Sequence, residues 1–273
     1  MTHFKDKTVV ITGGATGIGF GLAKRFGADG AKVVIGEPRQ NRLDEALAAL
    51  RADGIEAEAM VMDVADPASV EAFADFAWNA FGAVHVLVNN AGIALGRKAM
   101  TDLPLEDLHR LFNVNFFGVW HGAAIFGKRM IEAGEPAAIY NVASENALFN
   151  AVPNSAPYIA SKHAVRGLTE AMRDDFPDFI QIGMIIPGFV SSEMTPGSEA
   201  IAMGADTFAD KVVTQIAAGE FYVVTHPYNV VHIQARHEKL MDSFARNAPR
   251  YEGDDEHDVP TLIARMMARS KDQ

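Results

Sequence analysis

Tyr158 and Lys162 stand four positions apart in a stretch whose pattern predicts a helix over residues 157–176. Side chains at that spacing share one face of a helix. A free tyrosine has a pKa of about 10 and is a poor base at neutral pH, but a neighbouring ammonium favours the phenolate and lowers that pKa. The pair therefore suits general acid–base catalysis at a substrate oxygen. Taken alone, a chance pair on an amphipathic helix is the alternative.

Two further polar residues have positions that suit the same chemistry. Ser144 follows a predicted strand over residues 138–142 and precedes Tyr158 by fourteen positions. At the carboxyl edge of a sheet, its hydroxyl can donate to a substrate oxygen as negative charge builds there. Asn115 is an amide within an otherwise apolar run, which predicts either a satisfied core amide or a residue that holds a water beside Lys162.

A glycine-rich turn follows the first predicted strand and precedes a predicted helix over residues 17–28. Such a turn needs unrestricted φ, and a pyrophosphate can approach its backbone where no Cβ intervenes. The N-terminus of the following helix then offers free N–H groups and a positive dipole end. We predict that a dinucleotide binds this turn through Gly13, Thr16, Gly17, Ile18 and Gly19.

Polar and small residues close two other predicted strands at the same depth. Asp63 and Val64 end the third strand, where a carboxylate can accept from an adenine amino group. The fourth strand ends in Asn90, Ala91 and Gly92, whose small size leaves room for a ribose over the strand ends. These residues complete the predicted dinucleotide site.

The chain alternates short β-branched runs with longer amphipathic stretches. We predict strands over residues 8–12, 32–36, 57–62, 84–89, 138–142, 180–186 and 221–225, and helices over 17–28, 39–52, 67–81, 105–132, 157–176 and 207–218. Asp66 followed by Pro67 is a helix start. The fold class is α/β, a single Rossmann-type doubly wound parallel sheet of about seven strands with helices on both faces and a C-terminal helical extension. Residues 1–273 form one domain, with a core over about 5–230, a substrate loop over 190–215 and a helical tail over 230–273.

Composition excludes several other functions. A net charge of −11 over 273 residues disfavours nucleic acid as a partner. No cysteine is present to serve as nucleophile or metal ligand, and His226, His232 and His237 do not share a helical face, so we expect no metal. The chain lacks both a signal-peptide pattern at its start and an apolar stretch long enough to span a bilayer. We expect a cytoplasmic enzyme without a membrane partner.

In the order and spacing of these motifs, residues 5–230 resemble the short-chain dehydrogenases/reductases. The resemblance implies hydride transfer to a nicotinamide dinucleotide, with Asn115, Ser144, Tyr158 and Lys162 as the catalytic tetrad. Tyr158 and Lys162 also contact the cofactor, Lys162 through the nicotinamide ribose. The nicotinamide carboxamide and the diphosphate are held by Pro187, Gly188, Val190 and Ser192. Relatives pair through two long helices, which implies a homodimer or homotetramer.

The end of the second predicted strand bears on the choice between NAD and NADP. Glu37 stands where a carboxylate accepts from a free ribose 2′-hydroxyl, and Thr16 is not the basic residue that marks a 2′-phosphate. Arg39 and Arg42 follow, and a guanidinium binds phosphate well. The tail is similar to that of bacterial alcohol dehydrogenases that reduce bulky hydrophobic ketones with NADPH. The balance leans slightly to NADP(H), with NAD(H) left open.

Apolar residues after Ser144 and after Pro187 predict an adaptable wall for the substrate. They are Phe149, Phe189, Met194, Ile201, Met203 and Phe208. No Arg or Lys lies in residues 189–210 to bind a charged group, so we expect a hydrophobic ketone or secondary alcohol. A dehydratase or epimerase that uses the same Tyr/Lys pair, and a non-catalytic dinucleotide-binding regulator, remain alternatives.

Overall fold

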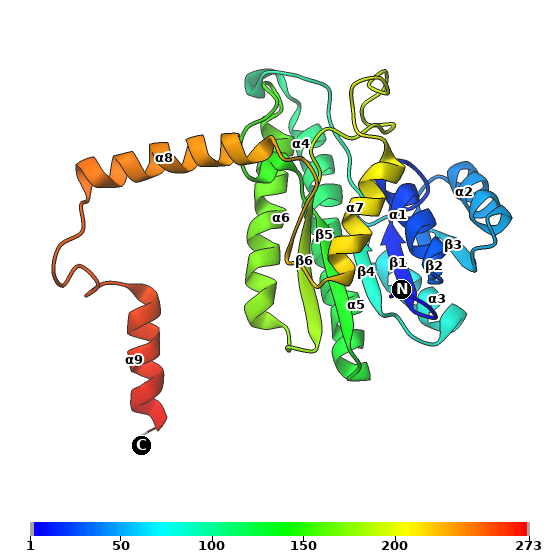
Figure 1. Ribbon diagram of the computed structural model, residues 1–273, viewed down its shortest axis with the longest axis horizontal. Helices are drawn as coiled ribbons and strands as arrows, with labels where there is room; N and C mark the ends of the chain where they lie inside the picture. Colours follow the sequence, from blue (N-terminus) through cyan, green and yellow to red (C-terminus); the bar gives the residue numbers. More distant parts are fainter. Residues whose placement is uncertain (1–2, 272–273) are drawn as a thin grey trace. The chain divides into compact units, whose positions relative to one another are not determined.

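The computed structural model describes residues 3–271, and within them seven parallel strands form one sheet in the order β3-β2-β1-β4-β5-β6-β7 (Figure 1). The strands are β1 (Thr8–Thr12), β2 (Lys32–Glu37), β3 (Ala57–Val61), β4 (Val86–Asn89), β5 (Ala137–Val142), β6 (Ile180–Ile186) and β7 (Tyr222–Val224). Each predicted strand is confirmed to within two residues at each end. The strand order reverses between β1 and β4, so loops leaving their carboxyl ends diverge and open a crevice there.

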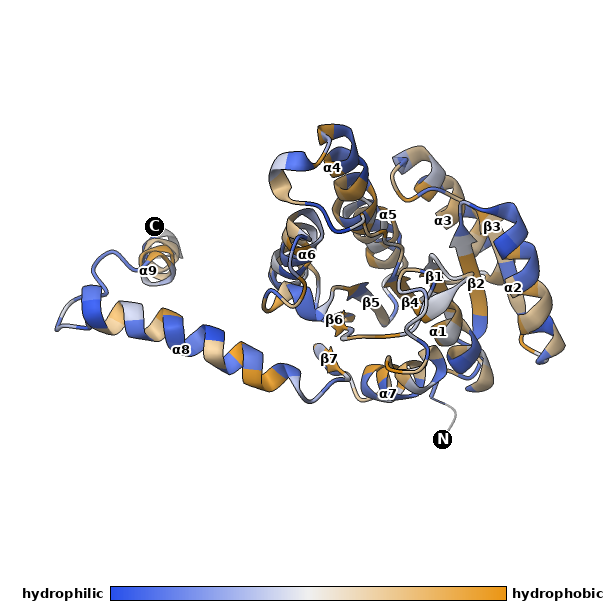
Figure 2. Ribbon diagram, turned by 90° about the horizontal axis from the view of Figure 1, so that it is seen from above, coloured by the Kyte–Doolittle hydropathy of each residue, from blue (hydrophilic) through white to orange (hydrophobic). Residues whose placement is uncertain are grey.

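Helices cover both faces of the sheet, as Figure 2 shows from above. One face carries α1 (Gly17–Ala28), α2 (Gln40–Ala52) and α7 (Ala205–Ala217), and the other carries α3 (Pro67–Phe81), α5 (Gly118–Ala133) and α6 (Ala156–Asp175). Alternation along β1 supplies both cores, because Val9 and Ile11 pack toward the first layer and Val10 toward the second. The predicted fold class, including the helical extension, is confirmed.

The single helix predicted over residues 105–132 is wrong in its middle. The structure has α4 (Leu105–Phe112), a π-helical turn η2 (Asn113–Phe117) and then α5. Residues within a π turn bond one position further along the chain than in an α-helix, which rotates the face that follows. The apolar pattern continues through the turn, so the sequence did not reveal it. Asn115 lies inside this turn and is fully buried, with 0% of its surface exposed.

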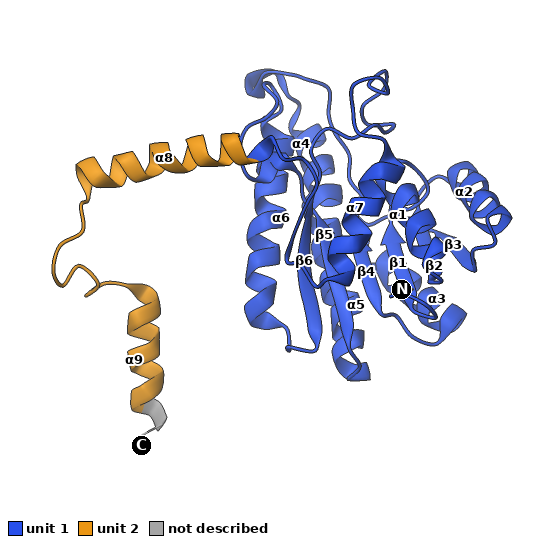
Figure 3. Cartoon of the chain, in the orientation of Figure 1, with its two compact units in different colours: residues 1–229 blue, residues 230–273 orange. Residues whose placement is uncertain are grey.

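Two compact units divide the chain at Asn229 (Figure 3). The first holds the sheet, together with the short 3₁₀ turns η1 (Met100–Asp102) and η3 (Glu145–Ala147). The second holds almost all of α8 (Asn229–Asn247) and the whole of α9 (Val259–Lys271) as far as the structure describes it. That both act as one domain stays a prediction. Among residues 3–271, no helix combines the length and apolar character that crossing a bilayer requires.

The start of α3 provides a test of local stability. Asp66 accepts a hydrogen bond of 3.0 Å from the backbone N–H of Ala68 and so caps the helix. We expect Asp66→Ala to lower the free energy of unfolding by about 1 kcal/mol, because that N–H loses its acceptor. Urea denaturation measures the change. Asp66→Asn keeps an acceptor and is expected to stay close to wild type; equal losses in both variants would contradict the capping role.

Candidate active site

A cavity of about 840 Å³ opens at the carboxyl edge of the sheet, over the point where the strand order reverses. Its volume lies in the range typical of cofactor and ligand pockets. With the exception of Asn115, every residue that the sequence analysis assigned to catalysis or to the cofactor lines it. These are Gly13, Thr16, Gly17, Ile18, Gly19, Glu37, Arg39, Asp63, Val64, Asn90, Ala91, Gly92, Ser144, Tyr158, Lys162, Pro187, Gly188, Val190 and Ser192.

The glycine-rich turn is locked to the loop after β4. The Asn90 side chain donates to the backbone oxygens of Thr12 and Gly13, at 2.9 and 3.0 Å. Gly13 has a φ of +62°, and a Cβ there would lie 2.9 Å from the Cα of Ala91. Thr16 is the N-cap residue of α1, so the first N–H groups of this helix, which have no partner within the helix, lie at the cavity. A backbone cradle without side-chain obstruction fits a pyrophosphate.

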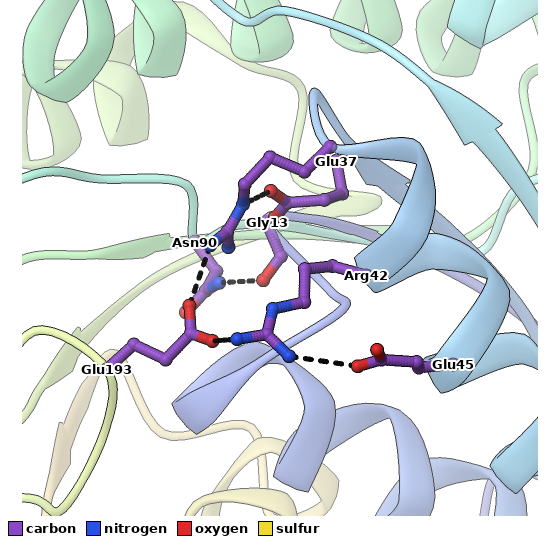
Figure 4. Close-up of polar contacts among 7 residues, drawn as sticks. Gly13, Glu37, Arg42, Glu45, Asn90 and Glu193 are labelled. Carbon is purple, nitrogen blue, oxygen red and sulfur yellow. Dashed lines mark hydrogen bonds and ion pairs between the residues drawn. The ribbon is translucent and has the colours of Figure 1, made fainter.

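A chain of alternating charges lies at the end of the cavity next to β2 (Figure 4). Arg39 donates to Glu37 at 2.5 Å and to Glu193 at 2.8 Å. The other carboxylate oxygen of Glu193 pairs with Arg42 at 2.6 Å, and Arg42 also pairs with Glu45 at 2.9 Å. The hydrogen bond from Arg39 lowers the pKa of Glu193, and the positive charges of both arginines act in the same direction. Both arginines are thus engaged by carboxylates.

Tyr158 and Lys162 lie one turn apart on α6, with the lysine Nζ 5.8 Å from the centre of the tyrosine ring. Lys162 is buried and donates to the backbone oxygen of Val142 at 2.9 Å. Burial lowers the pKa of Lys162 to about 8. Burial also raises the pKa of Tyr158; the hydrogen bond with Ser144 opposes that rise, and the charge of Glu145 adds to it.

The direction of the Tyr158 pKa shift differs from the sequence-based expectation. A cation next to the phenol was expected to lower the value, but desolvation of the phenolate prevails. The ammonium of Lys162 is directed at Val142, so its charge is not in hydrogen-bond contact with the phenol. Tyr158 consequently carries its proton at neutral pH in this structure and is ready to act as an acid.

Asn115 is fully buried and does not line the cavity, but it contacts residues that shape it. Its side-chain oxygen accepts from the N–H of Ile93 at 2.8 Å, and its amide nitrogen donates to the Ile93 oxygen at 3.0 Å. The same nitrogen lies 3.3 Å from the Ser161 hydroxyl, which donates to the backbone oxygen of Tyr158 at 2.8 Å. Asn115 therefore connects the loop after β4 to the turn of α6 that carries Tyr158. Its bond to a water beside Lys162 stays a prediction.

Ser144 is the N-cap of η3, directly after β5. Its hydroxyl oxygen accepts from the backbone N–H of Asn146 at 3.2 Å and from the Asn146 amide at 3.4 Å. These bonds occupy its acceptor positions and orient the hydroxyl, whose own proton is directed at the Tyr158 oxygen and is available to a substrate oxygen placed beside it. The geometry suits a donor to a substrate oxygen.

Sequence reasoning missed several residues that line or shape the cavity. Glu193 and Thr195 come from the loop between β6 and α7, and Arg110 comes from α4. Arg110 precedes Val114, another lining residue, by four positions, and this spacing was a usable signal. Of the six expected wall residues, Phe189 and Met194 line the cavity. The other four do not: Phe149 is buried, Ile201 is exposed to solvent, Met203 packs against the core, and Phe208 is fully buried on the inward face of α7.

The sequence profile of the short chain dehydrogenase family matches residues 7–201. This span contains the glycine-rich turn, Ser144 and the Tyr158/Lys162 pair. The chain belongs to the short chain dehydrogenase family. Its curated relatives are named as dehydrogenases and oxidoreductases, and the chain is an oxidoreductase of this family.

Two curated relatives resemble this family member over most of its length. One is 1-deoxy-11-beta-hydroxypentalenate dehydrogenase of Streptomyces avermitilis, 34% identical over 234 residues that cover 82% of this chain and 86% of the relative. Another is 3-alpha-(or 20-beta)-hydroxysteroid dehydrogenase of Mycobacterium tuberculosis, 39% identical over 191 residues that cover 69% and 71%. Both relatives are thus named for hydroxylated compounds.

Solved structures of family members are also similar. A short chain dehydrogenase/reductase of Burkholderia phymatum in complex with NAD has a TM-score of 0.82 and 30% identity, and the match covers 92% of this chain and 99% of that one. A gluconate 5-dehydrogenase of Burkholderia cenocepacia in complex with NADP and tartrate has a TM-score of 0.70 and 30% identity, covering 77% and 87%. Neighbours with either nicotinamide cofactor thus share the fold.

The cradle at Gly13 yields a prediction for ligand binding. We expect Gly13→Ala to abolish dinucleotide binding. The backbone at residue 13 has a positive φ, and the added Cβ would lie 2.9 Å from the Cα of Ala91. Gly54→Ala is the matched control, since Gly54 has a φ of +75° but nothing within 4 Å of the added carbon. The control is expected to lose about 1 kcal/mol of stability and to keep binding. Titration of NADH fluorescence measures affinity; binding by Gly13→Ala at wild-type strength would contradict the cradle.

Proposed function

We propose that this family member interconverts a hydrophobic secondary alcohol and its ketone with a nicotinamide dinucleotide, and that Tyr158 is its general acid and base. One observation carries the proposal. Tyr158, Ser144 and Lys162 line the same cavity as the glycine-rich turn, so a ligand held by its phosphates at the turn can extend to the phenol. The NAD and NADP complexes among the structural neighbours support the class of cofactor.

The roles of the side chains follow from their contacts. A bound nicotinamide supplies or accepts the hydride, which no side chain of this protein can do. Ser144 donates a hydrogen bond to the substrate oxygen, and Tyr158 gives that oxygen its proton during reduction. The charge of Lys162 stabilises the phenolate that remains. Asn115 holds the turn of α6 in place through Ser161 and Ile93.

Apart from Arg110 of α4, the part of the cavity that we take as the substrate end is lined by apolar side chains. Its wall includes Ile93 and Leu95 after β4, Val114 in η2, and Phe189 and Met194 after β6. Burial of apolar substrate surface against these side chains favours a hydrophobic compound over a sugar-like one. The names of the hydroxypentalenate and hydroxysteroid dehydrogenases support the same class.

We further propose that NAD(H), rather than NADP(H), is the preferred cofactor. The sequence leaned slightly to NADP(H) because of two guanidinium groups near the ribose position and the similarity of the tail to that of NADPH-dependent alcohol dehydrogenases. In the structure, Arg39 and Arg42 face three carboxylates, those of Glu37, Glu45 and Glu193. Glu37 is 4% exposed and lines the cavity, so its charge is poorly screened. This excess of negative charge repels a 2′-phosphate, whereas a carboxylate can accept from a 2′-hydroxyl.

Replacement of Tyr158 tests the central role. We expect Tyr158→Phe to lower kcat for ketone reduction by about a hundredfold or more, because the proton donor is removed while the ring is kept. The dissociation constant for NADH should stay within about twofold. Steady-state rates with aryl alkyl ketones and a 3-ketosteroid, together with NADH fluorescence titration, measure both quantities.

The control for this variant is Tyr251→Phe, at a tyrosine in the tail that is 67% exposed and should leave both quantities unchanged. Full turnover by Tyr158→Phe would refute the assignment of Tyr158. Dinucleotide binding by the wild type without turnover of any tested ketone would instead favour the non-catalytic regulator.

Removal of two carboxylates tests the cofactor preference. We expect the double variant Glu37→Gln, Glu193→Gln to lower KM for NADPH about tenfold and to raise KM for NADH, because Arg39 and Arg42 become available to a phosphate. Glu199→Gln, in the same loop but bonded to the N–H of Gly197, is the matched control and should change neither. A wild-type enzyme with a lower KM for NADPH than for NADH would overturn the preference.

A further inference from the structure

The segment after β7, residues 225–228, lies against the turn that follows β6, residues 187–189. Gly188 donates its backbone N–H to Nδ1 of His226 at 3.1 Å, and Nε2 of His226 lies 3.3 Å from the backbone oxygen of Phe189. His226 is buried, with 9% of its surface exposed. One imidazole ring thus contacts the N–H of Gly188 and the carbonyl oxygen of Phe189, and both of these residues line the cavity.

These contacts determine where the ring carries its proton. A backbone N–H can only donate, so Nδ1 must be an acceptor and carries no proton. The Thr225 hydroxyl, 2.7 Å from Nδ1, then donates to the same atom. In the neutral ring the proton resides on Nε2, from which it is donated to the Phe189 oxygen. A second proton on Nδ1 would face the Gly188 N–H directly and break that contact.

The turn and the histidine fit together closely. A Cβ added to Gly188 would lie 2.5 Å from Cγ of His226 and 2.6 Å from the hydroxyl oxygen of Tyr228. Gly188 is therefore needed because these two rings approach its backbone, with ring centres 5.5 Å apart and edge to face. Any other residue at this position would push the turn away from the segment after β7.

Tyr228 extends the same contact toward Ser144. Its hydroxyl accepts from the N–H of Phe189 at 3.3 Å and donates to the carboxylate of Glu145 at 3.0 Å. Glu145 follows Ser144 in the chain and donates its own N–H to the Pro187 oxygen at 2.7 Å. The turn after β6 and the loop after β5 are thus held to each other by backbone and by side chain.

We propose that His226 is a positioning residue: its neutral ring holds the turn Pro187–Phe189 in the conformation that receives the nicotinamide end of the cofactor, and protonation of the ring at Nδ1 breaks its contact with Gly188 and so loosens the turn. The inference rests on the proposed function, because it takes the cavity beside the turn as the dinucleotide site. It assigns a role to a histidine outside the residues 7–201 that the family profile matches.

The charges around His226 determine the direction of its pH dependence. Burial lowers its pKa from 6.5; the Phe189 oxygen and Glu145 of η3 oppose this, and Lys211 of α7 adds to it. Tyr228, from the same segment as His226, faces the ring as a neutral phenol whose own pKa is raised by burial. His226 is therefore neutral at neutral pH, and the contact with Gly188 is lost as the pH falls through this lowered pKa.

Two substitutions separate position from titration. His226→Asn places an amide oxygen where Nδ1 stands, so it keeps an acceptor for Gly188 but cannot be protonated. His226→Leu removes both contacts. The dissociation constant of NADH by fluorescence, and kcat and KM for ketone reduction, are measured between about pH 5 and pH 8, with circular dichroism as a check on folding. The positioning role concerns KM for NADH more than kcat.

The expected results differ among the three proteins. Wild-type affinity for NADH falls in acid, as the pH drops through the lowered pKa of His226. His226→Leu binds about tenfold more weakly at every pH, whereas His226→Asn binds nearly as well as wild type at neutral pH and lacks the fall in acid. Gly188→Ala is expected to resemble His226→Leu.

His85 provides a matched control at the opposite edge of the sheet. Its Nδ1 accepts from the backbone N–H of Thr8 at 3.0 Å, and burial lowers its pKa as it does for His226. His85→Asn and His85→Leu should change stability but not affinity for NADH. If these variants altered the acid fall to the same extent as the His226 variants, a general effect of buried histidines would replace the proposed role.

Other outcomes would also overturn the inference. Wild-type affinity in His226→Leu, or an unchanged acid fall in His226→Asn, would each show that the ring does not control the turn. If His226→Leu does not fold, the comparison of wild type with His226→Asn decides. A wild-type protein that binds neither NADH nor NADPH at any pH would refute the proposed function itself. Binding that stays the same in the His226 variants would refute only the role of His226.

Discussion

The buried ammonium of Lys162 is the constraint on which the rest of the site depends. Burying a charge away from water is costly, and this cost lowers the pKa of Lys162 to about 8. The hydrogen bond from Lys162 to the Val142 oxygen, at the end of β5, offsets part of the cost. That contact fixes α6 against the sheet at one particular height. Tyr158, one turn earlier on the same helix, thereby comes to face Ser144. The hydrogen bond from the Asn115 amide to the Ser161 hydroxyl also holds this part of α6 in place. A small shift of α6 would therefore cost both the bond that stabilises the cation and the alignment of the phenol.

A second constraint acts on the loop between β6 and α7, which lines the cavity along much of its length. Near its start the loop is attached to the segment after β7, through Phe189 and its contacts with His226 and Tyr228. Further along, Glu193 attaches it to Arg39 and Arg42, on the other side of the glycine-rich turn. The loop also has an internal bridge from Val190, next to the first anchor, to Met203, beyond the second. In the proposed function, this one segment contacts both the cofactor and the substrate, so we expect a change at either anchor to affect the binding of both.

The sequence predicted what depends on local pattern or on a motif. Strands were found from β-branched runs, the cap of α3 from Asp66 and Pro67, and the cavity residues from their places after strands. The failures have physical reasons. A π turn leaves the apolar pattern of residues 105–132 unbroken, so Asn115 was placed on an ordinary helix. The bond between Arg39 and Glu193 joins residues 154 positions apart, and no local pattern carries that information. The sign of the Tyr158 pKa shift depends on the competition between desolvation and a nearby charge, which only the three-dimensional arrangement decides.

The contacts of Gly188 show why a family motif can be kept while its support changes. The proline and glycine of the turn lie within the span that the family profile matches, but His226 and Tyr228 lie beyond it. The φ of Gly188 is not in the left-handed region. A glycine is needed there because the rings of His226 and Tyr228 fill the place of a side chain. A relative with other residues after β7 must hold the same turn by different contacts or leave it looser. The proposed acid sensitivity of cofactor binding thus depends on the particular residues after β7 and does not follow from the proposed catalytic residues that the family profile covers.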